Sequence, residues 1–316
     1  MARKVIIDCD PGIDDAVALI LALFDPRLEV VAITTCSGTV ESDRCTQNVL
    51  GLLERLDPPR IPRVGAGTDP EDAPVSDNRF LHGTDGVGNL GFTPMQRQHQ
   101  VSSEKLIVET IKSDPDDVTI LCLGPLTGVA RAFQRDPSIM ELVDKVVVVG
   151  GSVDCIGDVT AAAEFNMHFD PTSATSVFRS HTTKTLIPLE ITNQVTFDLN
   201  LLNQIPPKHS RAGEVLHPML SHLFRSYRQH RAQETIALQA AIGIAYLVEP
   251  MLFRSEERGL EIEELGELTR GATIVDRRPF ATHQRGVEIV TTVDADAIKD
   301  CIINGLRFAG QETGGA

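Results

Sequence analysis

Two hydrophobic periods alternate along the first part of the chain. Residues 5–7 form a short apolar run, and the apolar positions from Val17 to Leu23 that follow it have the spacing of a helix. Residues 28–36 are rich in Val, Ile and Thr, as a buried strand should be, and residues 41–56 predict a second helix. Strand, helix, strand and helix in this order predict a parallel sheet with right-handed crossovers.

The remaining patterns continue this alternation to the end of the chain. The acidic stretch after Phe253 is compatible with a helix, and the chain is expected to fray from Gly310. Residues 65–95 are rich in Gly, Pro and Asp without periodicity, which predicts a long functional or mobile loop. Strands are expected at residues 118–123, 146–149, 184–189, 273–275 and 287–293, and helices at residues 106–111, 172–179, 213–231 and 294–308. The expected fold is α/β, with an open, mostly parallel central sheet flanked by helices.

Size and charge narrow the classes of protein further. The 316 residues suffice for one large domain, and no linker, internal repeat or low-complexity run marks a boundary, so a single domain over residues 1–316 is expected. A formal net charge of -15 argues against nucleic acid as a partner, because phosphate backbones need clustered Lys and Arg. The sequence also has no signal-peptide core and no bilayer-length apolar stretch, which predicts no membrane partner and a cytoplasmic location.

The cysteines show no metal-type spacing, and three of them lie in or beside apolar, strand-like runs. Reduced, buried thiols in a cytosolic protein fit this pattern best. The six are Cys9, Cys36, Cys45, Cys122, Cys155 and Cys301.

Four carboxylates surround the Pro-Gly turn that follows the first apolar run. Alternate side chains of a strand share a face, so Asp8 and Asp10 should project the same way, while Asp14 and Asp15 fall in the first turn of the next helix. Like charges this close are costly unless one is protonated or a cation lies between them. A hard cation such as Ca2+ or Mg2+ is the simplest interpretation. The alternative is that Asp14 only caps the helix and Asp10 is a solvated strand end.

Residues 8–16, Asp-Cys-Asp-Pro-Gly-Ile-Asp-Asp-Ala, resemble the amino-terminal signature of the nucleoside hydrolases, the inosine-uridine-preferring N-ribohydrolase family. Three later blocks are similar to motifs of that family. Residues 82–88 match its His-Gly-x-Asp-Gly-Leu-Gly loop, residues 124–130 its Gly-Pro-Leu-Thr-Asn-Ile-Ala block, and residues 157–171 its Gly-Asn-x-x-x-x-Ala-Glu-Phe-Asn-x-x-x-Asp-Pro block. The resemblance implies a Rossmann-like nucleoside hydrolase fold and hydrolysis of the N-glycosidic bond of ribonucleosides to free base and ribose.

The resemblance also implies roles for individual residues. A Ca2+ ion would be held by Asp10, Asp15 and the backbone carbonyl of Leu123, with Asp10 as the general base toward the adjacent water and His82 as the motif-matched acid near the nucleobase. Glu164 and Asn166 are two apart on a segment expected to be extended, so they should point to one side. Substrate contacts are implied for Asp14, Thr39, Asp158, Glu164, Asn166, Tyr227 and Arg231. The alternatives are that His82 lies in a flexible turn and that Tyr227 and Arg231 are ordinary helix-surface residues.

The chain departs from the family pattern at four positions to which the family assigns a role in the site. Thr39 and Asp158 each replace an Asn, which removes amide contacts to the sugar. A His-Asp pair in relatives, with Asp as a metal ligand and His near the leaving base, is replaced by Gln239 and Ala240. A cation that has lost one ligand is expected to bind weakly or through extra water.

These observations leave two hypotheses of different class. One is an active nucleoside hydrolase with an altered metal shell, which by resemblance would be a homodimer or homotetramer. The other is a noncatalytic nucleoside- or ribose-binding protein on the same scaffold, motivated by Gln239 and Ala240. A phosphatase of the haloacid-dehalogenase type is disfavoured, because it needs Thr or Val where this chain has Gly12. The sequence does not fix a preference for purine or pyrimidine bases, because base contacts come from variable loops.

Overall fold

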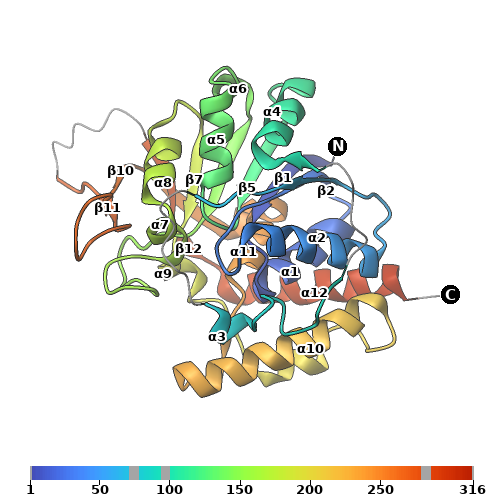
Figure 1. Ribbon diagram of the computed structural model, residues 1–316. Helices are drawn as coiled ribbons and strands as arrows, with labels where there is room; N and C mark the ends of the chain where they lie inside the picture. The colour runs from blue at the N-terminus through green and yellow to red at the C-terminus, as the bar shows by residue number, and fades with distance from the viewer. Residues whose placement is uncertain (1, 71–77, 94–99, 279–285, 315–316) are drawn as a thin grey trace.

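The computed structural model describes residues 2–70, 78–93, 100–278 and 286–314, and within them it contains the predicted sheet. Ten strands follow the order β11-β10-β12-β7-β6-β5-β1-β2-β3-β4 and pair in parallel, except where β10 pairs antiparallel with β11 and β12 (Figure 1). Their bounds are β1 (Arg3–Cys9), β2 (Leu28–Thr35), β3 (Arg63–Ala66), β4 (Val101–Ser102), β5 (Val118–Cys122), β6 (Lys145–Val149), β7 (Lys184–Ile187), β10 (Phe253–Ile262), β11 (Thr273–Val275) and β12 (Gly286–Val293). The short strands β8 (Thr196–Phe197) and β9 (Ile236–Ala237) form a separate pair. The expected α/β fold with a mostly parallel sheet is confirmed.

Helices cover both faces of the sheet, at the top and the bottom of Figure 1. One face packs against α4 (Ser103–Ser113), α5 (Thr127–Arg135) and α8 (Pro171–Arg179). The other face packs against α1 (Ile13–Phe24), α2 (Ser42–Leu56), α10 (Arg211–Ser226), α11 (Gln239–Val248) and α12 (Ala295–Thr313). Shorter helices are α3 (Arg79–His82), α6 (Ile139–Leu142), α7 (Phe165–Phe169) and α9 (Leu189–Thr192), together with the 3-10 turns Leu199–Asn203 and Pro250–Leu252 and the π-helical turn Tyr227–Arg231.

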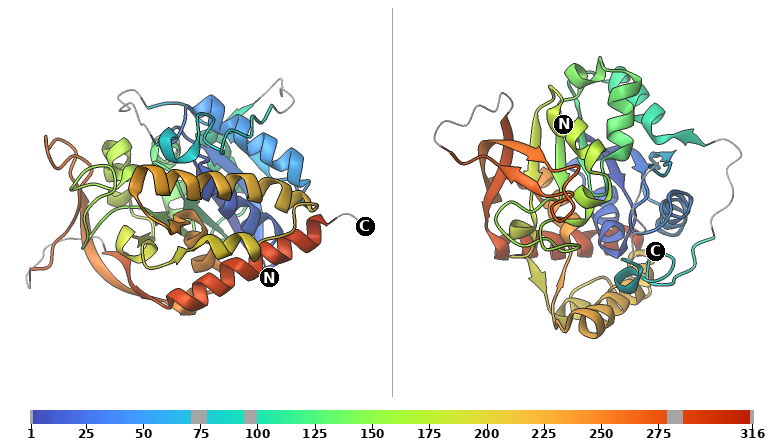
Figure 2. Two further views of the ribbon diagram at one scale, coloured as in Figure 1. Left: turned by 90° about the horizontal axis from the view of Figure 1, so that it is seen from below. Right: turned by 60° about the vertical axis from the view of Figure 1, so that its left-hand side comes forward.

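The continuous apolar runs of the central strands follow from this two-sided cover. Ile6 and Ile7 of β1 point to opposite faces, yet neither side chain is exposed to solvent. Helix α1 is apolar nearly all round for the same reason, because α10, α11 and α12 all pack against it. Figure 2 shows α10 and α12 side by side along the outer face.

The direction in which successive strands are added reverses beside β1. From β1 the chain adds β2, β3 and β4 on one side, and β5, β6 and β7 then extend the other side. Loops that leave the carboxyl ends of β1 and β5 therefore diverge, and in open α/β sheets such a point forms a crevice that binds ligands. The segments from Asp8 to Ala16 and from Leu123 to Ala130 begin there.

Three predicted elements differ from the structure. The acidic stretch after Phe253 is not a helix but strand β10, whose charged side chains stay exposed while its backbone pairs with β11 and β12. The last helix does not fray at Gly310. The Thr313 hydroxyl donates a hydrogen bond to the Ala309 carbonyl and accepts one from the backbone N–H of Ala212, which holds the end of the helix in place. The loop expected at residues 65–95 contains the end of β3 and all of α3, and its residues 71–77 and 94–95 lie outside the described residues.

The thiols are free, and four of them are buried as expected. Cys155, however, is exposed on the loop after β6, and Cys301 is half-buried, so the expectation was wrong for Cys155. In the part of the chain described, no helix has both the length and the apolarity needed to span a bilayer.

Candidate active site

A pocket of about 600 Å3, including its open mouth, lies at the carboxyl ends of β1 and β5. All of the site residues predicted from the sequence line it. Those that follow strand ends, here called the strand-end group, are Asp10, Asp14, Asp15, Thr39, Leu123, Asp158, Glu164 and Asn166. Those contributed by α3, by α10 with the turn after it, and by the end of β9 with the start of α11, here called the helix group, are His82, Leu223, Tyr227, Arg231, Ala237 and Gln239.

Asp10 lies one residue beyond the end of β1 and is almost fully buried. Its Oδ2 accepts hydrogen bonds from the backbone N–H of Thr39 (2.6 Å) and from the Thr39 hydroxyl (3.0 Å). The carboxylate fits only because glycines flank it: a Cβ at Gly38 would lie 2.1 Å from Oδ2, and one at Gly124 would lie 2.4 Å from Oδ1. Burial raises the pKa of Asp10 to about 7, against the opposing effect of the Thr39 hydrogen bonds. Thr39 thus orients Asp10.

Asp14 and Asp15 occupy the first turn of α1, as predicted. Asp15 turns back and accepts a 3.3 Å hydrogen bond from the backbone N–H of Gly12, which caps the helix. Burial and the neighbouring charges of Asp14 and Asp10 raise the pKa of Asp15 well above its usual value. The structure therefore supports the view that this turn concentrates negative charge.

Asp8 does not join this cluster, although alternation along a strand predicted that it would. Its side chain lies on the face of the sheet that α5 covers, where Oδ1 accepts a 2.5 Å hydrogen bond from the Thr34 hydroxyl and Oδ2 has no hydrogen-bond partner. A Cβ at Gly128 of α5 would lie 3.1 Å from Asp8 Oδ1. Asp10 lies beyond the end of β1, so strand alternation no longer governs its direction. Burial raises the pKa of Asp8 to about 7.

Glu164 and Asn166 reach the pocket by a route that the sequence did not predict. The segment is not extended: Glu164 is the N-cap of α7, and Asn166 lies in its first turn. Glu164 Oε2 accepts hydrogen bonds from the backbone N–H groups of Gly151 (2.8 Å) and Met167 (3.2 Å). Burial is the main reason that the pKa of Glu164 rises to about 8, with repulsion from Asp158 adding to it.

The amide of Asn166 ties two strand ends together. Its Nδ2 donates to the backbone carbonyls of Leu123 (2.8 Å) and Val149 (3.1 Å), which end β5 and β6. Both amide hydrogens are therefore committed to backbone acceptors, and Oδ1 is the atom left for a ligand. The same bond fixes the Leu123 carbonyl.

Asp158 comes from the loop after β6. Its Oδ1 accepts a 2.9 Å hydrogen bond from the backbone N–H of Phe165. Burial raises the pKa of Asp158, and the positive charge of Arg231 partly opposes this rise. Asp158 therefore connects the two groups electrostatically.

His82 ends α3 and packs over the start of α1. Its Nδ1 accepts a 3.1 Å hydrogen bond from the backbone N–H of Ile13, and its side chain is only 12% exposed. Because Nδ1 accepts, the neutral ring carries its proton on Nε2. Burial lowers the pKa of His82, although Asp14 opposes this effect. His82 is thus a fixed pocket residue and not part of a flexible turn.

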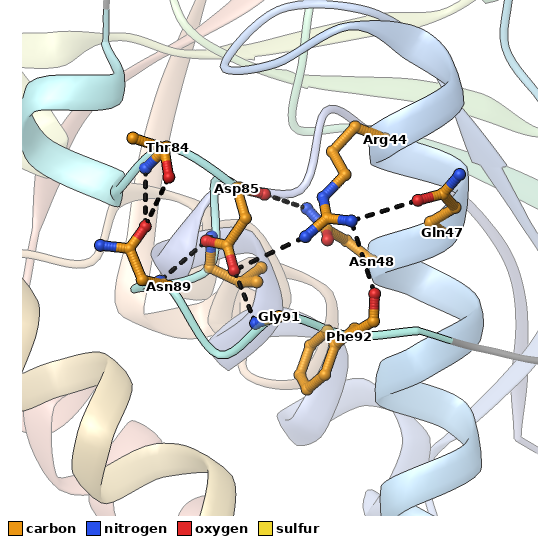
Figure 3. A network of polar contacts seen from close by, with 9 residues as sticks. Arg44, Gln47, Asn48, Thr84, Asp85, Asn89, Gly91 and Phe92 are labelled. Atoms are coloured by element: carbon orange, nitrogen blue, oxygen red, sulfur yellow. Dashed lines mark hydrogen bonds and ion pairs between the residues drawn. The ribbon is translucent and has the colours of Figure 1, made fainter.

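The loop after His82 is held by a polar network around Asp85 (Figure 3). The Asp85 carboxylate accepts hydrogen bonds from the backbone N–H groups of Val87, Asn89 and Gly91, and Asn48 of α2 donates to the Asp85 carbonyl. The motif residue Asp85 therefore shapes the loop that positions His82, which the sequence comparison had not assigned to it.

Tyr227 and Arg231 lie on the π-helical turn that continues α10. This turn places the guanidinium of Arg231 5.1 Å from the centre of the Tyr227 ring. Burial raises the pKa of Tyr227 to about 12. Both residues line the pocket, and their role at its mouth stays a prediction.

The start of α11 brings Gln239 to the pocket, while Ala240 is buried beside it. Neither can replace a carboxylate ligand or a titrating acid. Among the described residues, no three His, Cys, Asp or Glu side chains form a group that could hold a metal ion.

The oxygen donors that remain still suit a hard cation. They are the carboxylates of Asp10 and Asp15 and the backbone carbonyl of Leu123, and Ca2+ and Mg2+ prefer such ligands. Burial, together with repulsion between neighbouring carboxylates, raises the pKa values of Asp10 and Asp15, and a cation would offset both effects. The donor set fits a divalent ion, with one protein ligand fewer at Ala240.

Several pocket residues were not predicted. Leu223 lies four residues before Tyr227 on the same helix face, so i,i+4 spacing could have found it once Tyr227 was chosen. Phe165 lies inside the recognised 157–171 block. Asn78, Leu81 and Ala237 carried no sequence signal, because tertiary packing alone brings them to the pocket.

Comparisons with known proteins agree with this fold. The profile of the family described as "Inosine-uridine preferring nucleoside hydrolase" matches residues 5–300. The protein named non-specific ribonucleoside hydrolase RihC from Salmonella enteritidis PT4 is 31% identical over 306 residues, which cover 96% of this chain and 98% of that protein.

Solved structures give the same result. The chain is similar to the plant nucleoside hydrolase PpNRh1 (TM-score 0.87, 28% identity, 97% of this chain and 99% of that chain). It is also similar to a purine-preferring ribonucleoside hydrolase from Gardnerella vaginalis (TM-score 0.90, 25% identity, 98% of this chain and 100% of that chain). The fold and the site thus define a hydrolase of N-glycosidic bonds. The chain belongs to the inosine-uridine preferring nucleoside hydrolase family.

Proposed function

We propose that this protein hydrolyses the N-glycosidic bond of ribonucleosides to free base and ribose, with Asp10 as the general base. The observation that carries the proposal is the placement of Asp10 in the pocket. Both Thr39 hydrogen bonds fall on Oδ2, which leaves Oδ1 to take a proton from water. A carboxyl group whose pKa burial raises to about 7 is also well matched to a general base near neutral pH.

The strand-end group supplies the contacts that we assign to ribose. Asp14, Glu164 and the Oδ1 atom of Asn166 offer acceptors for sugar hydroxyls, and Asp158 can add another in place of an amide. Their negative charge would stabilise the oxocarbenium-like sugar that forms as the bond to the base breaks. Thr39 serves by holding Asp10.

We assign the metal site to Asp10, Asp15 and the Leu123 carbonyl. When bound, a divalent cation such as Ca2+ would supply positive charge that lowers the pKa of the water next to Asp10. Asn166 keeps the Leu123 carbonyl in place, and the Gly12 amide keeps Asp15 in place. These residues bind and orient; Asp10 moves the proton.

Incubation of the purified protein with inosine or uridine and Ca2+, followed by a reducing-sugar assay, tests the proposal. Release of ribose that depends on Asp10 is the expected result. Absence of release for all ribosides, with nucleoside binding still measurable by calorimetry, would instead support the second candidate, a noncatalytic nucleoside-binding protein. Gln239 and Ala240 are the observation that favours this candidate.

The assembly and the location of the protein stay predictions. A homodimer or homotetramer and a cytoplasmic location are what the family resemblance and the sequence lead us to expect. Sedimentation velocity of the purified protein checks the first of these.

A further inference from the structure

The charges that line the pocket are strongly unbalanced. Among the described residues that line it, one guanidinium, that of Arg231, stands against five carboxylates, so a divalent ion would still leave the fully ionised pocket negative. Burial disfavours ionisation of these carboxyl groups in the empty pocket and so raises the pKa values of Glu164 and Asp158. A positively charged ligand would stabilise their ionised forms. The five carboxylates belong to Asp10, Asp14, Asp15, Asp158 and Glu164.

The helix group offers no ready proton for a departing base. His82 Nδ1 is occupied by the Ile13 amide, so the ring is held as a neutral imidazole whose remaining N–H is a very weak acid. The Tyr227 phenol, with its pKa raised to about 12, keeps its proton near neutral pH. Gln239 carries an amide that does not titrate.

Neutral and cationic ribosides differ in whether the departing base needs a proton when its bond to C1' breaks. When the bond between C1' and a neutral purine or pyrimidine breaks, its electron pair leaves an anionic base unless an acid protonates that base. When the same bond breaks in a pyridinium riboside, the pair neutralises the ring nitrogen, and the heterocycle departs without a proton. Among the described residues, the helix group has no poised acid and the pocket lining has excess negative charge, so this site suits the second case on both counts.

We propose that the preferred substrates are N-ribosides of cationic, pyridinium-type heterocycles. This inference rests on the proposed function and specifies its substrate class. Water adds to C1' as the C1'–N bond breaks, Asp10 takes the proton of that water, and the products are ribose and the neutral heterocycle. The carboxylates around the sugar also attract the positive ring, while Gln239 and His82 contribute hydrogen bonds at its edge.

Steady-state kinetics with four substrates tests the proposal near pH 7 in the presence of Ca2+. Nicotinamide riboside is the cationic probe, and inosine and uridine are neutral ribosides whose bases need a proton. 4-Nitrophenyl β-D-ribofuranoside is neutral but has a leaving group that needs none. General acid catalysis contributes about 10^2-fold or more, so kcat/KM for nicotinamide riboside should exceed that for inosine and uridine by about that factor.

The outcomes separate this inference from the function on which it rests. Equal or faster cleavage of inosine or uridine overturns the cationic preference and leaves the proposed function standing. Cleavage of the nitrophenyl riboside without cleavage of nicotinamide riboside does the same, because it shows a working sugar site that rejects the cation. Failure with all four substrates overturns both.

A variant at position 239 tests the cause. Gln239→His adds a titrating side chain, so it should raise the ratio of kcat/KM for inosine and uridine to kcat/KM for nicotinamide riboside by about tenfold or more. Gln239→Asn, the matched control without a titrating group, should not change the ratio between substrates. An unchanged ratio in a folded Gln239→His protein contradicts the argument from the missing acid.

Discussion

The two groups of residues that meet in the pocket differ in what their departures from the family pattern remove. The strand-end group has Thr39 and Asp158 in place of Asn but retains Asp10, Asp14, Asp15, Glu164 and Asn166, and hydrogen bonds with backbone groups fix most of these side chains. The helix group contains the replacements at residues 239–240 and is carried by helices and a π-helical turn.

This difference has a physical basis. A residue at a strand end is surrounded by the sheet, so changing it disturbs buried hydrogen bonds as well as any ligand. A residue at a helix start over the pocket mouth can change with fewer consequences for packing. The strand-end group therefore keeps its carboxylates, whereas the helix group has an amide at Gln239 in place of a titrating side chain.

The largest expected effect concerns the centre of the strand-end group. Asp10→Asn should lower kcat by about 10^3-fold, because the amide cannot accept the proton of the attacking water. Asp8→Asn is the matched control, since Asp8 is also buried near the end of β1 but lies outside the pocket, and its kcat should stay near that of the wild type. Steady-state assays on the same ribosides decide; comparable losses in both variants would contradict the assignment.

Glu164→Gln should have a smaller effect. The amide oxygen can still accept from the Gly151 and Met167 N–H groups, but the negative charge toward the sugar is lost, so kcat/KM should fall by about 10- to 100-fold. Glu190→Gln is the control, because Glu190 likewise accepts backbone N–H groups, from Val153 and Asp154, outside this pocket. An unchanged kcat/KM for Glu164→Gln would remove Glu164 from the sugar site.

The third prediction concerns Ala240, where the family pattern has an Asp that binds the metal ion. The wild-type protein should bind Ca2+ weakly, and Ala240→Asp should tighten binding by about 10- to 100-fold by adding an anionic oxygen donor, with Ala240→Asn giving a smaller gain. Isothermal titration calorimetry measures all three. Submicromolar Ca2+ affinity in the wild type would show that the missing ligand is not needed.

The smallest effect concerns Asp8, at the edge of the strand-end group. Its folded-state pKa of about 7 lies above the usual 3.8, so the stability that the neutral carboxyl provides is present below about pH 4 and lost as the pH rises through 7. Asp8→Asn should therefore match the wild type at low pH and exceed its free energy of unfolding at pH 8, with the difference growing as the pH rises toward 7. Urea unfolding at both pH values measures this; a constant difference between the proteins would mean that Asp8 is ionised throughout.

Much of the fold could be predicted because it is encoded locally. The apolar runs of the central strands required burial on both faces, and the motif blocks located the strand ends, so all eleven predicted site residues lie in one pocket. The prediction failed where contacts between distant segments determine the structure. The acidic segment after Phe253 forms strand β10 because its backbone pairs with β11 and β12. Helix α12 continues to Thr313, whose hydroxyl accepts a hydrogen bond from Ala212 of α10.

By itself, the sequence determined the parallel α/β sheet, the crowding of acids after the first strand and the absence of a carboxylate at Ala240. These follow from periodicity and residue chemistry, which are properties of neighbours along the chain. Only the tertiary structure decided that Asp8 turns away from Asp10, that Thr39 holds Asp10, and that Ile13 occupies the ring nitrogen of His82. Each of these depends on groups far apart in sequence, whose burial and hydrogen bonds exist only once the sheet has brought them together.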